Sequence, residues 1–371
     1  MRENVPLAPM TTLGVGGPAR FFVDAEDEAT ALSALEWART SGVEPTILGG
    51  GSNALVSDRG VDGLVLRVRM RGVREVSPGG GDAAKVVVEV GAGEELDALV
   101  EGSVRAGRAG IECLSGIPGY VGATPIQNVG AYGQEIGETI VSVKTIDRKT
   151  RETRVFDNAA CAFSYRSSVF KSRLLHQYIV VSVTLALTPG GEPTLKYPEL
   201  SRHLASQGGD PRSLADVRRS VLAIRRSKSM VIDPSDPNRQ SAGSFFVNPV
   251  VTAERAGEIE QASGRTGDPM PRFAAGDKVK LSAAWLIEHA GWSKGASEGP
   301  VGLSTRHALA IVNRGGATAA QIVDFAARVR AAVMTQFGVA LAVEPVLLGF
   351  TPAEASGLAA AVDAPPGPLL E

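Results

Sequence analysis

Hydrophobic residues recur every three or four positions in four segments of the chain, and this spacing predicts four helices. The segments are residues 27–40, 96–104, 213–227 and 318–337. The last segment begins with Thr318 and Gln321 in a capping-box arrangement and is followed by Gly338, a residue type that commonly ends a helix. Its apolar stripe is typical of a helix that packs against a core.

Short apolar runs between these segments predict strands. They lie at residues 21–23, 46–48, 63–68, 85–90, 140–143 and 178–186. The residues before the first run are expected to form a loop. The polar stretch ASQGGDPR at residues 205–212 is a candidate domain boundary, and SPGGGD within residues 77–85 is expected to be an exposed, turn-like insertion without evident chemistry.

Three glycine-rich loops offer backbone N–H groups that side chains do not shield. They lie at residues 49–53, 91–93 and 116–133, and the first two each follow a predicted strand. Such loops can surround an anion such as a phosphate. The third is long for a loop in a compact domain, which favours a binding role. Together the loops suggest a nucleotide held by backbone amides in the first half of the chain.

Length and composition restrict the class of protein. A chain of 371 residues with 44% hydrophobic and 21% charged residues is expected to fold into two or three domains. The net charge of −2 argues against a general nucleic-acid surface. The start has no signal-peptide pattern and no apolar run could span a bilayer, so we expect a cytoplasmic protein without a membrane partner. Two cysteines and four histidines show no metal-ligand spacing, so we expect neither a zinc site nor a disulfide.

Two other motifs lead to alternative functions. Residues 14–19 match the G-x-G-x-x-A pattern of a dinucleotide-binding turn, but they lack a preceding strand and contain a proline where the helix should start. Residues 50–54 come close to a nucleophile elbow, which would make Ser52 the nucleophile of a hydrolase with His203, His289 or His307. A nucleotide-binding protein without catalytic activity is a third possibility.

Four longer motifs occur in order along the chain. They are LGGGSNALVSD (48–58), IPGYVGATPIQNVGAYGQE (117–135), FSYRSSVFK (163–171) and SAGSFFVNP (241–249). In sequence and spacing they resemble the UDP-N-acetylenolpyruvoylglucosamine reductase family, flavoproteins of bacterial cell-wall synthesis. The resemblance extends from about Thr12 to Gly349. The chain departs from it at Val247, where the family often has lysine, and near Glu344, where only one acidic residue flanks the proline.

The resemblance implies an α+β fold with two FAD-binding subdomains of the vanillyl-alcohol-oxidase type, followed by a smaller α+β substrate domain. The corresponding boundaries are residues 1–69 and 70–212 for the two subdomains, 213–350 for the substrate domain with a returning C-terminal strand, and 351–371 for a mobile tail.

The resemblance also implies two cofactors, FAD and NADPH. Residues 49–53 would surround the FAD pyrophosphate, and residues between Gly116 and Gly130 would support the flavin. The implied cofactor-binding residues are Gly49, Gly50, Gly51, Ser52, Asn53, Gly116, Pro118, Gly119, Gly122, Ala123, Gln127, Asn128 and Gly130. Some proteins of this fold attach FAD through histidine. Because no histidine precedes His176, we expect noncovalent FAD.

The implied reaction reduces the enolpyruvyl ether of UDP-N-acetylglucosamine to UDP-N-acetylmuramate. By resemblance, the catalytic residues are Arg166, Ser244 and Glu344. Arg166 would meet the substrate carboxylate and the enolate, Glu344 would share a hydrogen bond with the enolic intermediate, and Ser244 would donate the final proton. Local sequence alone leaves plainer interpretations open: a solvated strand-end arginine, a strand-end glutamate before a proline, and a turn serine.

The implied substrate-binding residues are Tyr132, Tyr165, Tyr197, Lys228 and Asn248. Lys228 suits a diphosphate or an NADPH phosphate, although it could equally be one charge of a basic cluster at a helix end. Tyr197 indicates the subclass that closes a tyrosine loop over the sugar nucleotide. We expect a monomer whose partner is this small-molecule substrate.

Overall fold

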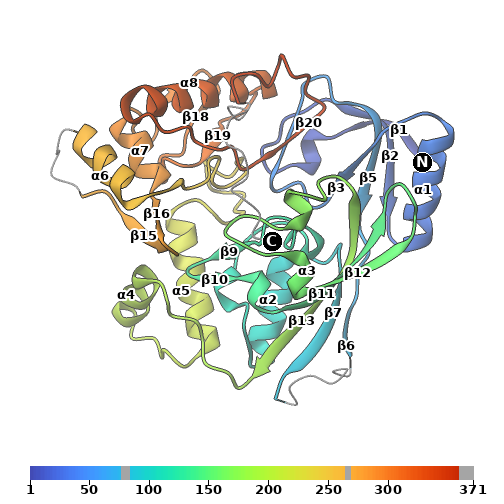
Figure 1. The fold of residues 1–371 in the computed structure, drawn as a ribbon, viewed down its shortest axis with the longest axis horizontal. Coiled ribbons are helices and arrows are strands. Elements are labelled where there is room, and N and C mark those ends of the chain that lie inside the picture. Colours follow the sequence, from blue (N-terminus) through green and yellow to red (C-terminus); the bar gives the residue numbers. More distant parts are fainter. Residues whose placement is uncertain (77–83, 264–268, 359–371) are drawn as a thin grey trace. The chain divides into compact units, whose positions relative to one another are not determined.

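The computed structural model describes residues 1–76, 84–263 and 269–358, and the chain divides into two compact units. Unit 1 consists of Met1–Val5, Ala19–Ser52 and Asp62–Asp233. Unit 2 consists of Pro6–Pro18, Asn53–Val61 and Pro234–Glu371. Each unit therefore combines segments that are far apart in the sequence (Figure 1).

The first sheet of unit 1 has four strands in the order β1-β2-β5-β3. Their bounds are Arg2–Pro6 (β1), Pro18–Ala25 (β2), Val61–Val68 (β5) and Pro45–Leu48 (β3). β3 runs parallel to β5, with Thr46 opposite Val65. The predicted strands at residues 21–23, 46–48 and 63–68 are confirmed. The expectation of an N-terminal loop was wrong, because Arg2–Pro6 gains a strand partner in β2 that the local sequence does not reveal.

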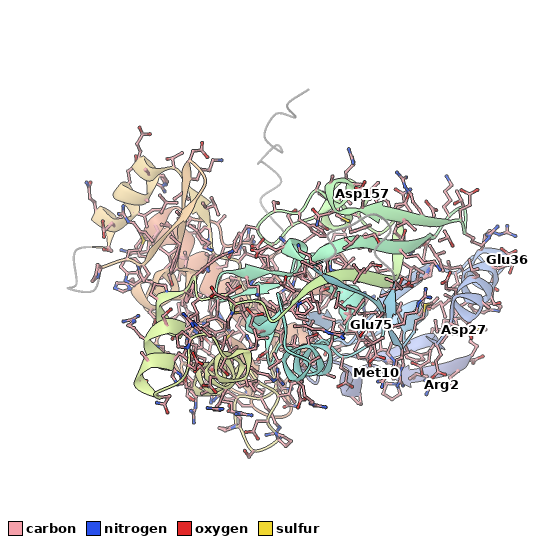
Figure 2. The ribbon with its side chains drawn as sticks, turned by 90° about the horizontal axis from the view of Figure 1, so that it is seen from below. Arg2, Met10, Asp27, Glu36, Glu75 and Asp157 are labelled. Carbon is pink, nitrogen blue, oxygen red and sulfur yellow. The ribbon has the colours of Figure 1, made fainter. Side chains whose placement is uncertain are left out.

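Helix α1 (Glu28–Thr40) connects β2 to β3 and confirms the first predicted helix. The Asp27 carboxylate accepts a hydrogen bond of 2.7 Å from the backbone N–H of Thr30, which satisfies one of the unpaired donors at the helix start. Figure 2 labels Asp27 and, further along the same helix, Glu36. Ala31, Ala34, Leu35 and Ala38 are buried on the side that faces the core of unit 1. The face predicted from the sequence is thus the packed one.

The second sheet of unit 1 has the strand order β12-β11-β13-β7-β6, and β8 pairs with one end of β13. The bounds are Thr153–Asp157 (β12), Ile140–Asp147 (β11), Tyr178–Pro189 (β13), Val86–Gly91 (β7), Val73–Val76 (β6) and Arg108–Ala109 (β8). All of these neighbours are antiparallel. A short hairpin of β9 (Gly130–Ala131) and β10 (Gln134–Glu135) belongs to the same unit.

Four helices complete unit 1, together with short 3-10 turns. The helices are α2 (Leu96–Arg105), α3 (Asn158–Cys161), α4 (Pro198–Ser206) and α5 (Leu214–Ser227). The turns are η2 (Glu112–Leu114), η3 (Val121–Ala123), η4 (Ile136–Glu138) and η5 (Val169–Lys171). Helices α2 and α5 confirm two predictions. Helix α4 was not predicted.

Helices α4 and α5 lie side by side and share one apolar cluster (Figure 1). Leu200 and Leu204 of α4 meet Val217 and Val221 of α5 around the buried Cys113. The polar stretch at residues 205–212 is therefore the end of α4 and its connection to α5, rather than a boundary between compact units. The contacts of the chain place that boundary after Asp233 instead.

The described residues of unit 2 form three small sheets and three helices. The strands are β4 (Ala54–Val56) and β20 (Val346–Leu348), then β14 (Val250–Val251), β16 (Lys278–Leu281) and β15 (Arg272–Ala275), and finally β17 (Ser297–Glu298), β18 (Val301–Leu303) and β19 (Ile311–Asn313). The helices are α6 (Ala253–Ala262), α7 (Ala283–His289) and α8 (Ala319–Phe337), with the turn η1 (Ala8–Met10).

Helix α8 forms as predicted, with a complete Thr318–Gln321 capping box and Gly338 in the left-handed conformation at its end. Its buried residues belong to the apolar core of unit 2, which also contains Phe245 and Phe246.

Strand β4 pairs in parallel with β20, so that Leu55 lies opposite Leu347. The expected returning C-terminal strand is therefore β20. Its partner belongs to a segment that we had expected in the first FAD-binding subdomain, within residues 1–69. The compact units place Asn53–Val61 with the C-terminal part of the chain instead.

Most of the predicted insertion at residues 77–85 and most of the predicted tail at 351–371 lie outside the described residues.

Both cysteines, Cys113 and Cys161, are free and buried. Of the helices within residues 1–76, 84–263 and 269–358, none combines the length and the apolar character that crossing a bilayer requires.

Candidate active site

The loop between β3 and β4 has the conformation of an anion cradle. Gly51 adopts a φ of 67°, in the left-handed region that suits glycine. Among the described residues, no group accepts a hydrogen bond from the backbone N–H of Gly50 or of Gly51. Two neighbouring N–H donors without a protein acceptor can bind the oxygens of a phosphate. Gly49 and Ser52 flank them in the same loop.

The first and third glycine-rich loops lie against each other in unit 1. A Cβ on Gly50 would lie 2.8 Å from the Cα of Gly119. This distance is too short for a non-bonded contact, so the two backbones can lie this close only because residue 50 has no side chain. Gly119 has a φ of 108°, and a Cβ there would lie 2.4 Å from the Ser52 hydroxyl. The two loops that the sequence proposed for one cofactor are therefore brought together. Pro118 precedes this contact.

The second glycine-rich loop, residues 91–93, is not a cradle, which corrects the sequence-based expectation. The backbone N–H groups of Gly91, Ala92 and Gly93 donate to protein carbonyls at 2.7–3.0 Å. A Cβ on Gly93 would lie 2.3 Å from the backbone of Arg69. The glycines here permit close packing of the chain, and no N–H group is left for a ligand.

Residues 116–130 are shaped largely by their own hydrogen bonds. Gly116, with a φ of 73°, donates its N–H to Asp97 at 2.6 Å. Gly122 donates its N–H to the Ala92 carbonyl at 2.9 Å, and Ala123 donates its N–H to the Tyr120 carbonyl at 3.0 Å within η3. Gln127 accepts a hydrogen bond of 3.4 Å from Lys171.

Asn128 is almost fully buried and its side chain is already engaged by the protein. Its Nδ2 donates to Glu135 at 2.6 Å and to the Ser164 carbonyl at 3.1 Å. Its Oδ1 accepts from the Gly137 N–H at 3.0 Å. With a φ of 47°, Asn128 holds a turn of the loop. These bonds fit a residue that shapes the loop rather than one whose side chain reaches a ligand.

Arg166 lies in a two-residue turn. Ser164 and Ser167 exchange both backbone hydrogen bonds, so Tyr165 and Arg166 form the tip. Arg166 has a φ of 55°, a conformation that is uncommon for residues other than glycine and is often found at functional sites. Its guanidinium donates to the Gly130 carbonyl at 3.0 Å and lies 5.5 Å from the centre of the Tyr165 ring. The alternative of a strand-end arginine does not hold.

Backbone pairing joins the segments that carry Ser244 and Glu344 in unit 2. Phe246 and Val343 form an antiparallel bridge, and the Glu344 N–H donates to the Phe245 carbonyl at 2.9 Å. Both predicted catalytic side chains are half-buried. No described group forms a hydrogen bond with the Ser244 hydroxyl, so this serine does not stabilise its own turn in the way that the plainer interpretation required.

Asn53 connects the first glycine-rich loop to the segment of Glu344 within unit 2. Its Nδ2 donates to the Glu344 carbonyl at 3.1 Å, and its own carbonyl accepts from the Val346 N–H at 2.9 Å. Asn53 thereby fixes the backbone of the predicted catalytic glutamate.

Tyr132 and Tyr197 form a pair in unit 1. Tyr132 and Gly133, with φ values of 50° and 81°, make the two-residue turn between β9 and β10. The two tyrosine rings lie edge to face with centres 5.9 Å apart. Burial raises the pKa of Tyr132 to about 12, against a smaller opposing effect of the nearby Arg225 charge. Both phenols therefore remain protonated and can donate hydrogen bonds at neutral pH.

Lys228 and Asn248 already have protein partners. Lys228 ends α5 and donates to the Glu199 carboxylate at 2.7 Å. Glu199 lies in the first turn of α4, two residues after Tyr197. Asn248, in unit 2, accepts a hydrogen bond of 2.9 Å from the first N–H of α7, at Ala283. The ion pair links Lys228 to the tyrosine segment.

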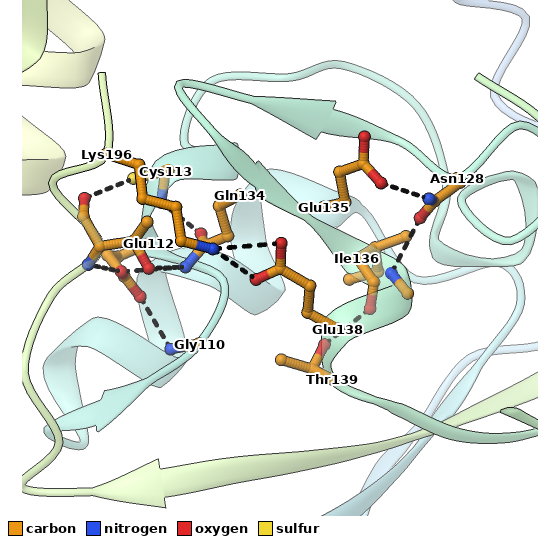
Figure 3. Close-up of polar contacts among 12 residues, drawn as sticks. Gly110, Glu112, Cys113, Asn128, Gln134, Glu135, Ile136, Glu138, Thr139 and Lys196 are labelled. Atoms are coloured by element: carbon orange, nitrogen blue, oxygen red, sulfur yellow. Dashed lines mark hydrogen bonds and ion pairs between the residues drawn. The ribbon is translucent and has the colours of Figure 1, made fainter. Parts of the chain in front are cut away.

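The sequence pattern did not indicate two buried groups. Arg225 is 8% exposed and donates to the carbonyls of Gly116 and Met230 at 3.3 and 2.6 Å. Burial lowers the pKa of its guanidinium. Glu112 is 0% exposed and binds three neutral N–H groups (Figure 3). A charged residue within apolar runs, IECLSG and LAIRRS, was the available signal.

Comparison with known proteins identifies the class first. A family model described as FAD binding domain matches residues 19–155. A solved structure, a UDP-N-acetylenolpyruvylglucosamine reductase from Thermus caldophilus, superposes with a TM-score of 0.63 at 26% identity and covers 93% of this chain and 98% of the other. The chain is an FAD-dependent oxidoreductase, and the predicted α+β class with an FAD-binding fold is confirmed.

The family follows from further matches. The model described as UDP-N-acetylenolpyruvoylglucosamine reductase, C-terminal domain, covers residues 234–348 and so begins where unit 2 resumes. A relative of that name from Thermobifida fusca is 47% identical over 94% of this chain and 98% of its own length. Another from Mycobacterium tuberculosis is 43% identical over 94% and 95%. This chain belongs to the UDP-N-acetylenolpyruvoylglucosamine reductase family, which confirms the resemblance inferred from its motifs.

The geometry of the first loop fits the cofactor of this class. The unused N–H groups of Gly50 and Gly51 suit the charged pyrophosphate of FAD, and the approach of Gly119 leaves no room for a side chain. The structure does not have the arrangement that a hydrolase with Ser52 as nucleophile would require. A nucleophile elbow requires a strand, a turn and a helix, whereas Ser52 is followed by strand β4.

Proposed function

We propose that this chain catalyses the NADPH-dependent reduction of UDP-N-acetylglucosamine enolpyruvate to UDP-N-acetylmuramate, a step in peptidoglycan precursor synthesis. The family of the chain supports this proposal. The observation that carries it is the pairing of residues 245–247 with 342–344, which joins the segments of Ser244 and Glu344, while no described group forms a hydrogen bond with the Ser244 hydroxyl. We further propose that the protein acts in the cytoplasm as a monomer.

When bound, FAD would accept a hydride from NADPH and return it to the enolpyruvyl group. Addition of hydride to the terminal carbon leaves the enolate of the substrate carboxylate, so the protein must stabilise negative charge and then supply a proton. We assign the charge to Arg166, whose planar guanidinium can offer two parallel N–H groups to a carboxylate. Its left-handed backbone and its bond to Gly130 hold the side chain in place.

Ser244 is proposed as the acid that protonates the adjacent carbon. Its hydroxyl has no competing hydrogen bond in the described protein, and Gly243, with a φ of 72°, forms the bend before it. Buried Phe245 and Phe246 anchor the serine from the other side. Glu344 is proposed to share a hydrogen bond with the enolic intermediate, on a backbone that Asn53 fixes.

For the cofactor, the proposed contacts are the N–H groups of residues 49–53, and the loop from Gly116 to Gly130 supports the flavin. Within that loop Asn128 is assigned a shaping role, because its side chain is occupied. For the substrate we propose Tyr132, Tyr165, Tyr197, Lys228 and Asn248. The bond that fixes Asn248 Oδ1 leaves its Nδ2 as the donor.

Lys228→Gln is expected to raise the KM for the sugar nucleotide about tenfold, because a charge-assisted hydrogen bond to a phosphate is worth about 1.4 kcal/mol or more. Steady-state kinetics with varied sugar nucleotide provides the measurement. The matched control is Arg226→Gln, which removes an exposed positive charge two residues away. Equal effects of the two substitutions would show that only the charge of the helix end matters.

The flavin is expected to leave the chain completely on denaturation. His176 is the first histidine of the sequence, and it lies beyond both loops proposed to hold the cofactor. Acid precipitation followed by absorbance spectra of the pellet and the supernatant checks this. Flavin that remains in the protein pellet would contradict noncovalent binding.

The proposed function is tested by two anaerobic half-reactions on the purified holoprotein. NADPH should bleach the visible flavin absorbance, and the enolpyruvyl sugar nucleotide alone should restore it. A bleached protein that oxygen reoxidises but this substrate does not would be a flavoprotein acting on another molecule. A colourless protein that a fluorophosphonate labels at Ser52 would be the hydrolase.

A further inference from the structure

A closed set of hydrogen bonds holds the segment before Tyr197, and it centres on the buried Glu112. The Glu112 carboxylate is 0% exposed. Oε2 accepts from the Gly110 N–H at 2.8 Å, and Oε1 accepts from Gln134 Nε2 at 3.0 Å and from the Thr194 N–H at 2.7 Å. Figure 3 shows Glu112, Cys113 and Gln134 joined in this arrangement. All three donors are neutral, so the carboxylate is stabilised by hydrogen bonds alone.

The backbone N–H, the hydroxyl and the carbonyl of Thr194 all form hydrogen bonds within the same set. Its N–H binds Glu112, and its hydroxyl accepts from Gln134 Nε2 at 2.9 Å. Its carbonyl accepts from the Cys113 thiol at 3.2 Å. Burial raises the pKa of that thiol, which keeps the S–H group as the donor. Gln134 Oε1 accepts from the Cys113 N–H at 2.8 Å and closes the set.

The four residues come from three distant parts of the chain that meet at the tyrosine pair. Thr194 lies three residues before Tyr197, in a stretch, residues 191–197, without helix or strand. Gln134 lies two residues after Tyr132, at the other side of the β9–β10 turn. Both tyrosines and Leu195 pack on the cluster that contains Cys113. Lys196, in the same stretch, makes an exposed ion pair with Glu138 at 3.4 Å.

An exposed ion pair contributes little, whereas a buried carboxylate that loses a donor is destabilised strongly. The hydrogen bonds of Glu112 and Gln134 with Thr194 therefore contribute more to the position of the 191–197 stretch than the Lys196 ion pair does. We propose that Glu112, Cys113, Gln134 and Thr194 form a clamp that positions Tyr197 against Tyr132 for the sugar nucleotide. The four are positioning residues, because none of them is assigned a contact with substrate. This inference rests on the proposed function of the two tyrosines.

The test uses the holoprotein with two substitutions. Glu112→Gln replaces one carboxylate oxygen with an NH2 group. Both oxygens of Glu112 accept hydrogen bonds from N–H groups, so this NH2 group would face another donor. Thr194→Val removes only the hydroxyl that accepts from Gln134 and keeps the shape of the side chain. Thr194→Ser restores the hydroxyl, and Glu138→Gln is the matched control, since it makes the same chemical change at an exposed carboxylate of the same region.

The dissociation constant of the sugar nucleotide is measured from the change in absorbance of the oxidised flavin, without turnover. We expect an increase of about tenfold or more for Glu112→Gln, about threefold for Thr194→Val, and values within twofold of wild type for Thr194→Ser and Glu138→Gln. The limiting rate of reoxidation at saturating substrate should change less than twofold. Hydrogen exchange of the amides of residues 191–197 should be faster in both clamp variants.

An unchanged dissociation constant in a folded Thr194→Val protein, together with unchanged exchange, would overturn the clamp. If Glu112→Gln does not fold or lacks flavin, Thr194→Val and its serine control decide the question. A merely structural role would lower the melting temperature while leaving substrate affinity per bound flavin intact. Failure of the wild-type protein to be reoxidised by the substrate would instead refute the proposed function, so the two failures are distinguishable.

Discussion

Ser244→Ala is expected to leave the reduction of the flavin by NADPH within about twofold of wild type and to slow its reoxidation by the sugar nucleotide by about 10² or more. The reason is that, in the proposed mechanism, the hydroxyl is needed only after hydride has reached the substrate. Because no described group forms a hydrogen bond with this hydroxyl, its removal costs no structural bond. Anaerobic stopped-flow measurement of the two half-reactions separates the steps.

The control for this experiment is Ser241→Ala, which removes another hydroxyl of the same segment. Ser241 Oγ accepts a hydrogen bond of 3.3 Å from the Gly243 N–H and has a structural role in the turn. It should slow reoxidation far less than Ser244→Ala. Equal slowing of both half-reactions by Ser244→Ala would remove this serine from the acid role.

Gly50→Ala is expected to weaken FAD binding about 10²-fold, so that the protein purifies with little colour. The new Cβ would lie 2.8 Å from the Gly119 Cα and 3.1 Å from the Tyr120 N, and backbone atoms cannot move aside as a flexible side chain can. Overpacking of this kind costs about 1–3 kcal/mol, and about 2.7 kcal/mol corresponds to the expected factor. Titration of the apoprotein with FAD, followed by flavin fluorescence, gives the dissociation constant.

The matched control is Gly102→Ala on the exposed side of α2. A Cβ there meets no atom within 4 Å, and the helical conformation suits alanine. This substitution should retain full colour and raise the free energy of unfolding by about 0.4–1 kcal/mol. If Gly50→Ala binds FAD as tightly as Gly102→Ala does, the close contact of the two loops is not needed for the cofactor.

Elements with a strong local signal were predicted well from the sequence. Helices α1, α5 and α8 have serine, threonine or aspartate at their starts and regular apolar spacing, so their limits could be read locally. Strand β1 and the parallel pair β4–β20 could not, because each depends on a partner from elsewhere in the chain. The boundary expected near residue 212 was misplaced because a polar connection between α4 and α5 resembles a linker when its shared core is unknown.

The site shows the same division. Glycine spacing indicated the 49–53 and 116–130 loops, but it could not separate them from residues 91–93, whose N–H groups are consumed by the fold. Ser244 and Glu344 were proposed through family resemblance, since 100 residues of sequence separate two segments that one antiparallel bridge joins. Glu112 escaped notice because its partners lie 22 and 82 residues away.

The hydrogen bond between Asn53 and the Glu344 carbonyl joins residues that are 291 positions apart in the sequence. Strand β4 and its partner β20 are separated by a similar length of chain. A ribosome that synthesises this chain releases Asn53–Val61 early, when no part of its eventual sheet or of the α8 core exists. Unit 1, by contrast, has all of its sequence available once Asp233 has emerged. The order of synthesis therefore favours folding of the FAD-binding part first. The pairing of β4 with β20, next to Glu344, can form only when the end of unit 2 has been synthesised, so a truncated nascent chain cannot bring together the residues that we propose as acid and enolate-binding group.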